Sequence, residues 1–133
     1  KVIAQGSDYI MMENARGYQL VLMNCNNINP YFALEESFLR KLNKDLCVTI
    51  TGLQPGKYQI RKYIFDKEHG ALYTNWWRMN SKYGLDQEMI ESIIRSSHPA
   101  LEIYDETLKE DWSFFSYLTS NAIHFFDIRK VVD

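Results

Sequence analysis

The chain has 133 residues, 46% of them hydrophobic and 14% aromatic, which is enough apolar material for one globular domain with its own core. Lys and Arg number 15 against 17 Asp and Glu, a net charge of −2 with no basic stripe, so we expect no direct contact with nucleic acid. The apolar runs fall far short of the ~20 residues that cross a bilayer, so we expect no membrane segment and a cytoplasmic protein. Because the sequence opens on Lys1 rather than Met, we interpret residues 1–133 as one domain of a longer multidomain chain.

The first half of the chain alternates between apolar and polar residues with a period of two, which is typical of strands that bury one face. Two such runs, 8–13 and 18–24, flank Asn14-Ala15-Arg16-Gly17, in which Asn and Gly favour a hairpin turn. These runs predict the first strand pair.

A third alternating run covers residues 46–51 and places Leu46, Val48 and Ile50 on the face that we expect to meet the core. Gln54-Pro55-Gly56 is a turn signal, so we expect residues 57–65 to return as the second strand of another hairpin. In that strand the apolar positions change face near Arg61-Lys62, for which we predict a β-bulge.

Helical periodicity appears in three places. Leu72, Trp76 and Met79 share one helical stripe and predict a short helix, while residues 34–42 could form an amphipathic helix or a loop. The clearest helix follows Asp86, a natural N-cap, and ends before Pro99.

Strand patterns return after Pro99, in the runs 100–107, 112–118 and 123–131, the last two rich in aromatic residues. About seven strands in hairpin order with one or two inserted helices predict a mainly β fold, an antiparallel β-sandwich. No internal repeat interrupts it.

Cysteine and histidine positions give no metal or redox motif. Cys25 and Cys47 are 22 positions apart in apolar surroundings, and we interpret both as buried thiols rather than as a disulfide. His69, His98 and His124 lack metal-ligand spacing, so we expect His69 to close a turn, His98 to end a helix and His124 to be an exposed polar position in a strand. We therefore expect no metal and no cofactor.

An ordered set of motifs in the middle of the chain resembles a known family. Leu53-X-Pro-Gly-Lys-Tyr-X-Ile-Arg61 is followed by Glu68-His69-Gly70, a Trp-bearing helix that ends at Met79, a capped helix over 85–95, and Pro99-X-Leu101-X-Ile103-Tyr104. This order resembles the C-terminal β-sandwich of glycoside hydrolase family 39, the β-xylosidase family, over roughly residues 7–131.

The resemblance implies an accessory role and no catalysis by this domain. In that family the two catalytic glutamates lie on an upstream (β/α)8 barrel, which residues 1–133 do not contain, so we expect the domain to pack against such a barrel. Related barrels and sandwiches also form the C-terminal half of long AraC-type bacterial transcription regulators. Segment 26–44 and the aromatic final strands depart from the xylosidase pattern, which favours a regulator as the parent.

The segment 63–80 combines acids, a histidine and two tryptophans, and it allows three interpretations. Catalysis would need carboxylates facing each other across a sugar, and the sequence offers no opposing carboxylate. Saccharide binding would use exposed aromatic faces, and domain docking would bury them against a neighbour. The candidates for either role are Tyr73, Trp76, Trp77 and Arg78.

We favour the docking seam, with a polar network behind it. Arg61, Asp66, Glu68 and His69 would form this network, and Arg61 would pair with Asp66 or Glu68. Two alternatives remain: an accessory domain of a catalytic β-xylosidase, and an independent carbohydrate-binding module with a saccharide ligand. An uncovered seam could also join two copies of the isolated domain in a dimer.

Overall fold

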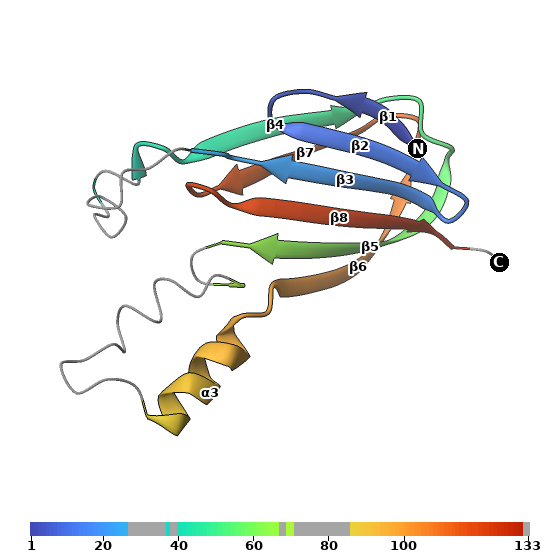
Figure 1. Ribbon diagram of the computed structural model, residues 1–133. Coiled ribbons are helices and arrows are strands. Elements are labelled where there is room, and N and C mark those ends of the chain that lie inside the picture. The colour runs from blue at the N-terminus through green and yellow to red at the C-terminus, as the bar shows by residue number, and fades with distance from the viewer. Residues whose placement is uncertain (27–36, 38–39, 67–68, 71–85, 132–133) are drawn as a thin grey trace.

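The computed structural model describes residues 1–26, 37, 40–66, 69–70 and 86–131. Within these residues the chain forms eight strands and one helix, arranged as a six-stranded and a two-stranded antiparallel sheet (Figure 1). The elements are β1 (Val2–Gln5), β2 (Tyr9–Asn14), β3 (Gly17–Met23), β4 (Lys44–Ile50), β5 (Gly56–Phe65), α3 (Gln87–Ser96), β6 (Ala100–Leu108), β7 (Trp112–Leu118) and β8 (Ile123–Lys130). The predicted mainly β sandwich is confirmed.

The large sheet has the strand order β1-β2-β3-β8-β5-β6, and the small sheet pairs β4 with β7. All seven predicted strands are present, and β1 is an eighth that the sequence reading missed. Its register against β2 shifts between Val2 and Ala4, so its side chains do not follow a simple alternation. No helix among the described residues is long and apolar enough to cross a membrane.

The core lies between the two sheets, on the face of the large sheet that carries the even-numbered residues of β3, β5 and β8. Its buried side chains include Leu20, Leu22, Tyr58, Ile60, Phe126 and Ile128. Leu46, Val48 and Ile50 of β4 pack against it as predicted, and the rings of Phe114 and Phe126 lie 5.1 Å apart across the sheets.

The predicted second hairpin is wrong, because β4 and β5 belong to different sheets. The connection between them passes from one layer to the other instead of turning back. Gly52 takes a positive φ of 75° there, and the side chain of Leu53 is buried in the core while its N–H donates to the carbonyl of Glu110 at 2.9 Å. A turn motif fixes a local change of direction but not the partner of the strand that follows.

The predicted bulge in β5 is also wrong. The pairing of β5 runs without a shift from Gly56 to Ile64 against β6 and from Tyr58 to Phe65 against β8. The apparent slip arises because the sheet carries apolar side chains on both faces: Tyr58 and Ile60 face the core, and Tyr63 and Phe65 lie on the opposite face.

Helix α3 begins and ends as predicted. Asp86 is its N-cap and accepts a hydrogen bond from the N–H of Met89 at 2.9 Å, while Glu88 in the first turn and Arg95 in the last complement the helix dipole. Figure 1 shows α3 projecting beyond the ends of β5 and β6. The predicted helix around Trp76 lies outside the described residues, as does most of the predicted helix over 34–42.

Both cysteines are free and exposed, so their predicted burial is wrong. Cys47 lies on the outer face of β4, between the half-buried Leu46 and Val48, and Cys25 follows the end of β3. In a strand with only one covered face, a thiol between two core positions necessarily points outward.

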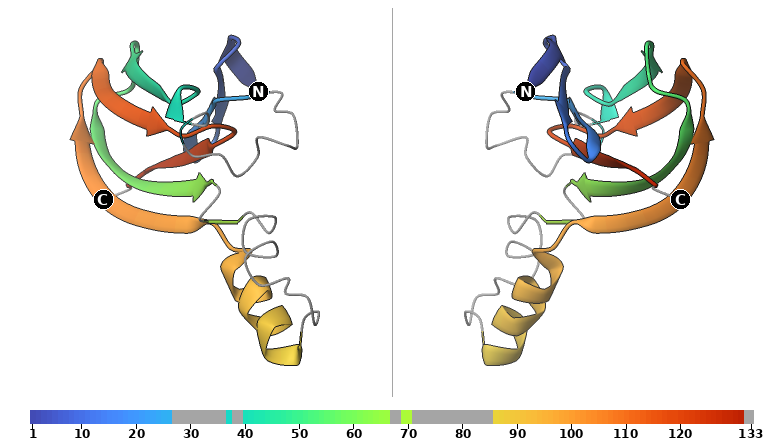
Figure 2. Two further views of the ribbon diagram at one scale, coloured as in Figure 1. Left: turned by 90° about the vertical axis from the view of Figure 1, so that its left-hand side faces the viewer. Right: turned by 90° about the vertical axis from the view of Figure 1, so that its right-hand side faces the viewer.

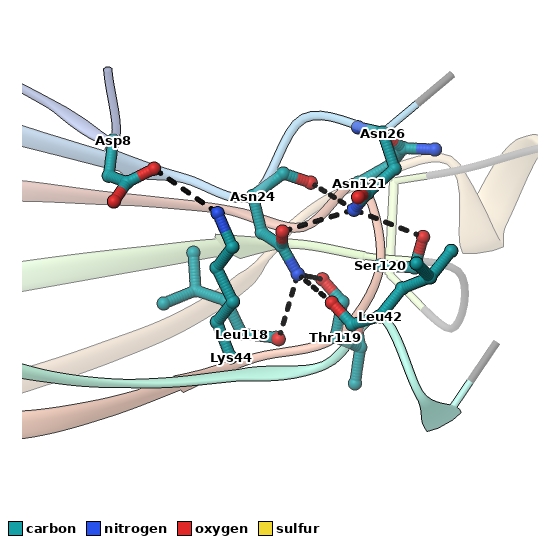
Figure 3. Close-up of polar contacts among 9 residues, drawn as sticks. All are labelled: Asp8, Asn24, Asn26, Leu42, Lys44, Leu118, Thr119, Ser120 and Asn121. Carbon is teal, nitrogen blue, oxygen red and sulfur yellow. Dashed lines mark hydrogen bonds and ion pairs between the residues drawn. The ribbon is translucent and has the colours of Figure 1, made fainter. Parts of the chain in front are cut away.

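A buried amide joins the two sheets at one end of the sandwich (Figure 3). The side chain of Asn24, which is 0% exposed, donates to the carbonyls of Leu42 at 2.7 Å, Thr119 at 3.1 Å and Leu118 at 3.3 Å. Its backbone carbonyl accepts from the N–H of Asn121 at 2.7 Å. Asn24 thereby connects the end of β3 with the start of β4 and with the turn between β7 and β8.

A second polar contact crosses the core nearby. His124 of β8 is 5% exposed, and its Nδ1 lies 2.7 Å from the hydroxyl of Ser116 on β7. The predicted exposure of His124 is therefore wrong, because its position in β8 faces the small sheet. Burial, with a further contribution from Lys62, lowers the pKa of His124 to about 4.

Replacing Asn24 should destabilise the whole domain. Asn24→Ala removes a buried donor from three carbonyls, and we expect a loss of about 2 to 4 kcal/mol in the free energy of unfolding, measured by urea denaturation. The matched control is Asn43→Ala, which removes an exposed hydrogen bond to the hydroxyl of Tyr117 and should cost no more than about 1 kcal/mol. Equal losses in the two variants would show that Asn24 is not the link we describe.

The buried histidine should make stability depend on pH. An unfolded histidine binds a proton below about pH 6.5, whereas His124 in the fold stays neutral down to about pH 4. Stability is therefore full above pH 6.5 and falls as the pH drops towards 4, by up to about 3 kcal/mol.

His124→Gln cannot be protonated and keeps a hydrogen-bonding group for Ser116. Its unfolding free energy, measured by urea denaturation at several pH values, should fall less than that of the wild type over the same window. Parallel pH profiles of the two proteins would contradict the conclusion that His124 causes the loss of stability at low pH.

Candidate docking surface

Apolar side chains cover part of the large sheet on the face that points away from the core. The odd-numbered residues of β3, β8, β5 and β6 share this face, and their register places Val21, Phe125, Tyr63 and Leu101 in one row across four strands. The outer face of an antiparallel sheet is normally polar when water covers it. We call the following residues the outer patch: Val21, Met23, Tyr63, Phe65, Leu101, Ile103, Ile123 and Phe125.

The outer patch is partly open to solvent. Leu101 is 48% exposed and Ile103 53%, and both lie on β6, the edge strand of the large sheet. Tyr63 and Phe125 are half-buried, and their rings lie 5.8 Å apart at 43°. Tilted aromatic pairs of this kind form a firm apolar platform that a neighbouring domain can cover.

Charged and amide side chains border the outer patch towards the other end of the strands. Arg61 of β5 stands directly opposite Asp127 of β8. The Nε of Arg61 lies 3.3 Å from the Oε1 of Gln59, and the Nε of Arg129 donates to Asp127 at 2.8 Å. An apolar centre beside a paired polar margin is the usual anatomy of a protein interface.

The turn after β5 lies beside the outer patch. The Oδ1 of Asp66 accepts from the N–H of His69 at 2.8 Å and lies 2.9 Å from the Nδ1 of the same residue. His69 therefore closes a turn, as predicted. Gly70 follows with φ +82°, and a Cβ at Gly70 would lie 3.2 Å from the Phe65 ring, so the turn packs closely on the patch.

The sequence-predicted site residues are only partly within the described chain. Tyr73, Trp76, Trp77, Arg78 and Glu68 lie outside it. Of the predicted polar network, Asp66 and His69 are in contact, and Arg61 lies in the polar margin of the outer patch. The pairing of Arg61 with Asp66 or Glu68 stays a prediction.

The sequence reading placed the patch residues on strands but not on a functional surface. A sequence signal for this surface lies in the apolar runs YQLVLM of β3 and IHFF of β8. A strand with one solvent-exposed face would alternate more regularly between apolar and polar residues. Continuous apolar strands indicate that both faces of a sheet are covered.

The described residues bring together two pairs of groups that can exchange a proton. One is Asp66 and His69 in the exposed turn after β5, where Oδ1 and Nδ1 lie 2.9 Å apart. The other is buried. Ser116 and His124 are close enough for proton transfer, but they are 2% and 5% exposed, so a substrate could not reach them. No group of three or more His, Cys, Asp or Glu side chains in the described ranges could hold a metal ion.

Comparison with known sequences finds bacterial regulators. The chain is 28% identical over 113 residues to uncharacterized HTH-type transcriptional regulators of Staphylococcus aureus, among them those of strains COL and N315. The match covers 85% of this chain and 15% of each regulator, so the chain spans less than one sixth of the length of these relatives. No protein-family model matches the chain.

Comparison with solved structures finds glycosidases of the same fold. A monomeric β-xylosidase from Caulobacter crescentus CB15 superposes with a TM-score of 0.74 at 12% identity, over 96% of this chain and 27% of the enzyme. A GH39 enzyme from Xanthomonas axonopodis pv. citri gives a TM-score of 0.75 at 8% identity, over 98% of this chain and 28% of that enzyme. The chain therefore has the β-sandwich fold that forms part of these enzymes, and its sequence relatives are HTH-type regulators.

Proposed function

We propose that the chain is a non-catalytic accessory β-sandwich, the C-terminal domain of an AraC-type transcriptional regulator. In this proposal the outer patch packs against an upstream barrel of the (β/α)8 type, and DNA is contacted by other parts of the protein. The observation that carries the proposal is the outer patch itself, an apolar surface across four strands where an isolated sandwich would present polar side chains.

The sequence relatives favour a regulator over an active enzyme as the parent. The chain is 28% identical to these regulators over 113 residues, but only 12% and 8% identical to the two glycosidases. At 8% to 12% identity only the fold can be compared. The alternative, an accessory domain of a β-xylosidase, uses the same docking surface with a catalytic barrel.

A charge in the outer patch should weaken docking without unfolding the domain. The double variant Leu101→Lys, Ile103→Lys replaces two half-exposed side chains, so the unfolding free energy of the 133-residue chain should change by about 1 kcal/mol or less. In the full-length protein the same variant should weaken the contact between sandwich and barrel by about 2 kcal/mol or more, because apolar area is lost and two charges are buried at the interface.

The measurement is hydrogen exchange on β5 and β6, compared between the full-length protein and the 133-residue chain. The outer patch should be protected only in the full-length protein, and the double variant should remove that protection. Phe115→Lys is the matched control, since Phe115 is 77% exposed on the small sheet and lies outside the patch. If the two proteins show equal exchange at the patch, docking through this face is wrong.

The same variants test self-association of the isolated chain. An uncovered patch should join two copies weakly, and sedimentation at increasing concentration should detect a dimer that the Lys variant abolishes and Phe115→Lys leaves intact. A dimer that survives the Lys variant would use another face.

Saccharide binding offers a direct test of the third interpretation. If the domain is a docking module, titration with xylohexaose up to millimolar concentration should leave its tryptophan fluorescence unchanged. A saturable response that Trp77→Ala removes would instead make the chain a carbohydrate-binding module.

A further inference from the structure

A cleft of about 620 Å³ opens between the two sheets, on the side opposite to β6. Its floor is formed by Met11, Leu20 and Leu22, which are buried on the inner face of β2 and β3. The facing wall is β4, with the half-buried side chains of Leu46 and Val48. The cleft therefore reaches the hydrophobic core and is distinct from the outer patch.

The wall of the cleft is the edge of a strand rather than its face. Every residue from 46 to 53 lines the cleft. Successive side chains of a strand point to opposite faces, so a lining without gaps means that the cleft contacts the backbone edge of β4. Among the described strands β4 pairs only with β7, and β1 pairs only with β2. Ile3 and Ala4 of β1 line the cleft as well, and the end views in Figure 2 show β1 and β4 as separate strands that are not side by side. The cleft is thus bordered by two strand edges that lack a neighbour within the described chain.

The small sheet is too narrow to cover the large one. It has two strands against six, and the inward side chains of β4 are only half-buried although they pack on the core. Two-stranded sheets are marginal in water, and a third strand beside β4 would supply both backbone partners and apolar cover. The seven residues of β4 offer an edge of about 23 Å for it.

The charged side chains that line the cleft are acidic, Asp8 and Glu13. Asp8 is balanced by an ion pair with Lys44 of β4 at 3.3 Å (Figure 3), so Glu13 supplies the negative charge that a ligand would meet. A lipid chain could fill the apolar floor, but it would leave the backbone edge of β4 without partners. An extended peptide would fill the apolar floor with its side chains and pair with the backbone edge of β4. Basic residues in the peptide would complement the acidic side chain at the rim.

We propose that the cleft binds an extended polypeptide strand with apolar side chains at alternate positions and basic residues between them. The strand pairs with the free edge of β4 and makes the small sheet three-stranded. Its source is a segment of the same protein outside residues 1–133, because the relatives are more than six times as long as the matched segment. This source rests on the proposed function, whereas the pairing itself does not.

A synthetic peptide tests the pairing. The probe is acetyl-Lys-Val-Thr-Val-Lys-Val-Thr-Val-Lys-amide, added to the 133-residue chain while the β4 amides are followed by NMR. One matched peptide carries N-methyl groups on its odd-numbered residues and the other on its even-numbered residues. Each therefore lacks the backbone N–H donors along one of its two edges. We expect saturable binding that shifts β4 and is weakened at least ~10-fold in one of the methylated peptides.

Variants of the chain test the location. Val48→Phe fills the cleft and should abolish binding, whereas Phe115→Ala on the far face of the small sheet should leave it unchanged. The methylated peptides give an independent answer if Val48→Phe fails to fold. Absence of saturable binding at millimolar peptide, or equal binding by all three peptides, would overturn the pairing with β4.

The full-length protein tests the source. If its own segment occupies the cleft, the peptide should bind the 133-residue chain but not the full-length protein. Equal binding to both would overturn the same-chain source and leave a separate protein as the donor. Because this result concerns β4, it is independent of the hydrogen-exchange test on β5 and β6.

Discussion

The arrangement of the two sheets depends on the buried amide of Asn24. Its side chain satisfies carbonyls at the start of β4 and in the β7–β8 turn, and its backbone carbonyl receives the N–H of Asn121, a residue with a positive φ of 59°. A buried amide or carbonyl that loses its hydrogen-bond partner destabilises the fold. These bonds therefore hold the segment before β4 and the end of β7 against the end of β3. The contact between Ser116 of β7 and His124 of β8 joins the small sheet to the large one deeper in the core.

The unequal width of the two layers explains both surfaces that we assign to partners. A two-stranded sheet covers only part of one face of a six-stranded sheet, so apolar side chains remain beside β4 on the inner side. On the outer side the described chain leaves the outward side chains of the apolar strands β3 and β8 only partly buried. In the functions that we propose, both surfaces contact the rest of the protein.

Several corrections have the same cause. The apparent bulge at Arg61-Lys62 and the predicted exposure of His124 both follow from assigning faces to strands one at a time. A period of two determines which residues share a face, but it cannot say which face meets the core when both carry apolar residues. The Pro55-Gly56 motif likewise predicted a hairpin where the chain crosses from one sheet to the other.

The sequence by itself determined seven of the eight described strands, the α3 helix with its Asp86 cap, the β2–β3 hairpin and the mainly β class, because alternation, capping and turn chemistry are local. It also indicated a resemblance to the glycosidase sandwich and to a class of regulators, and the comparisons find glycosidases with this fold and HTH-type regulators. Only the tertiary structure decided the division into six and two strands, the burial of Asn24 and His124, the outer patch and the cleft beside β4. These features join residues that are far apart in the sequence, such as Asn24 and Thr119, which are separated by 95 positions, and no local pattern encodes such contacts.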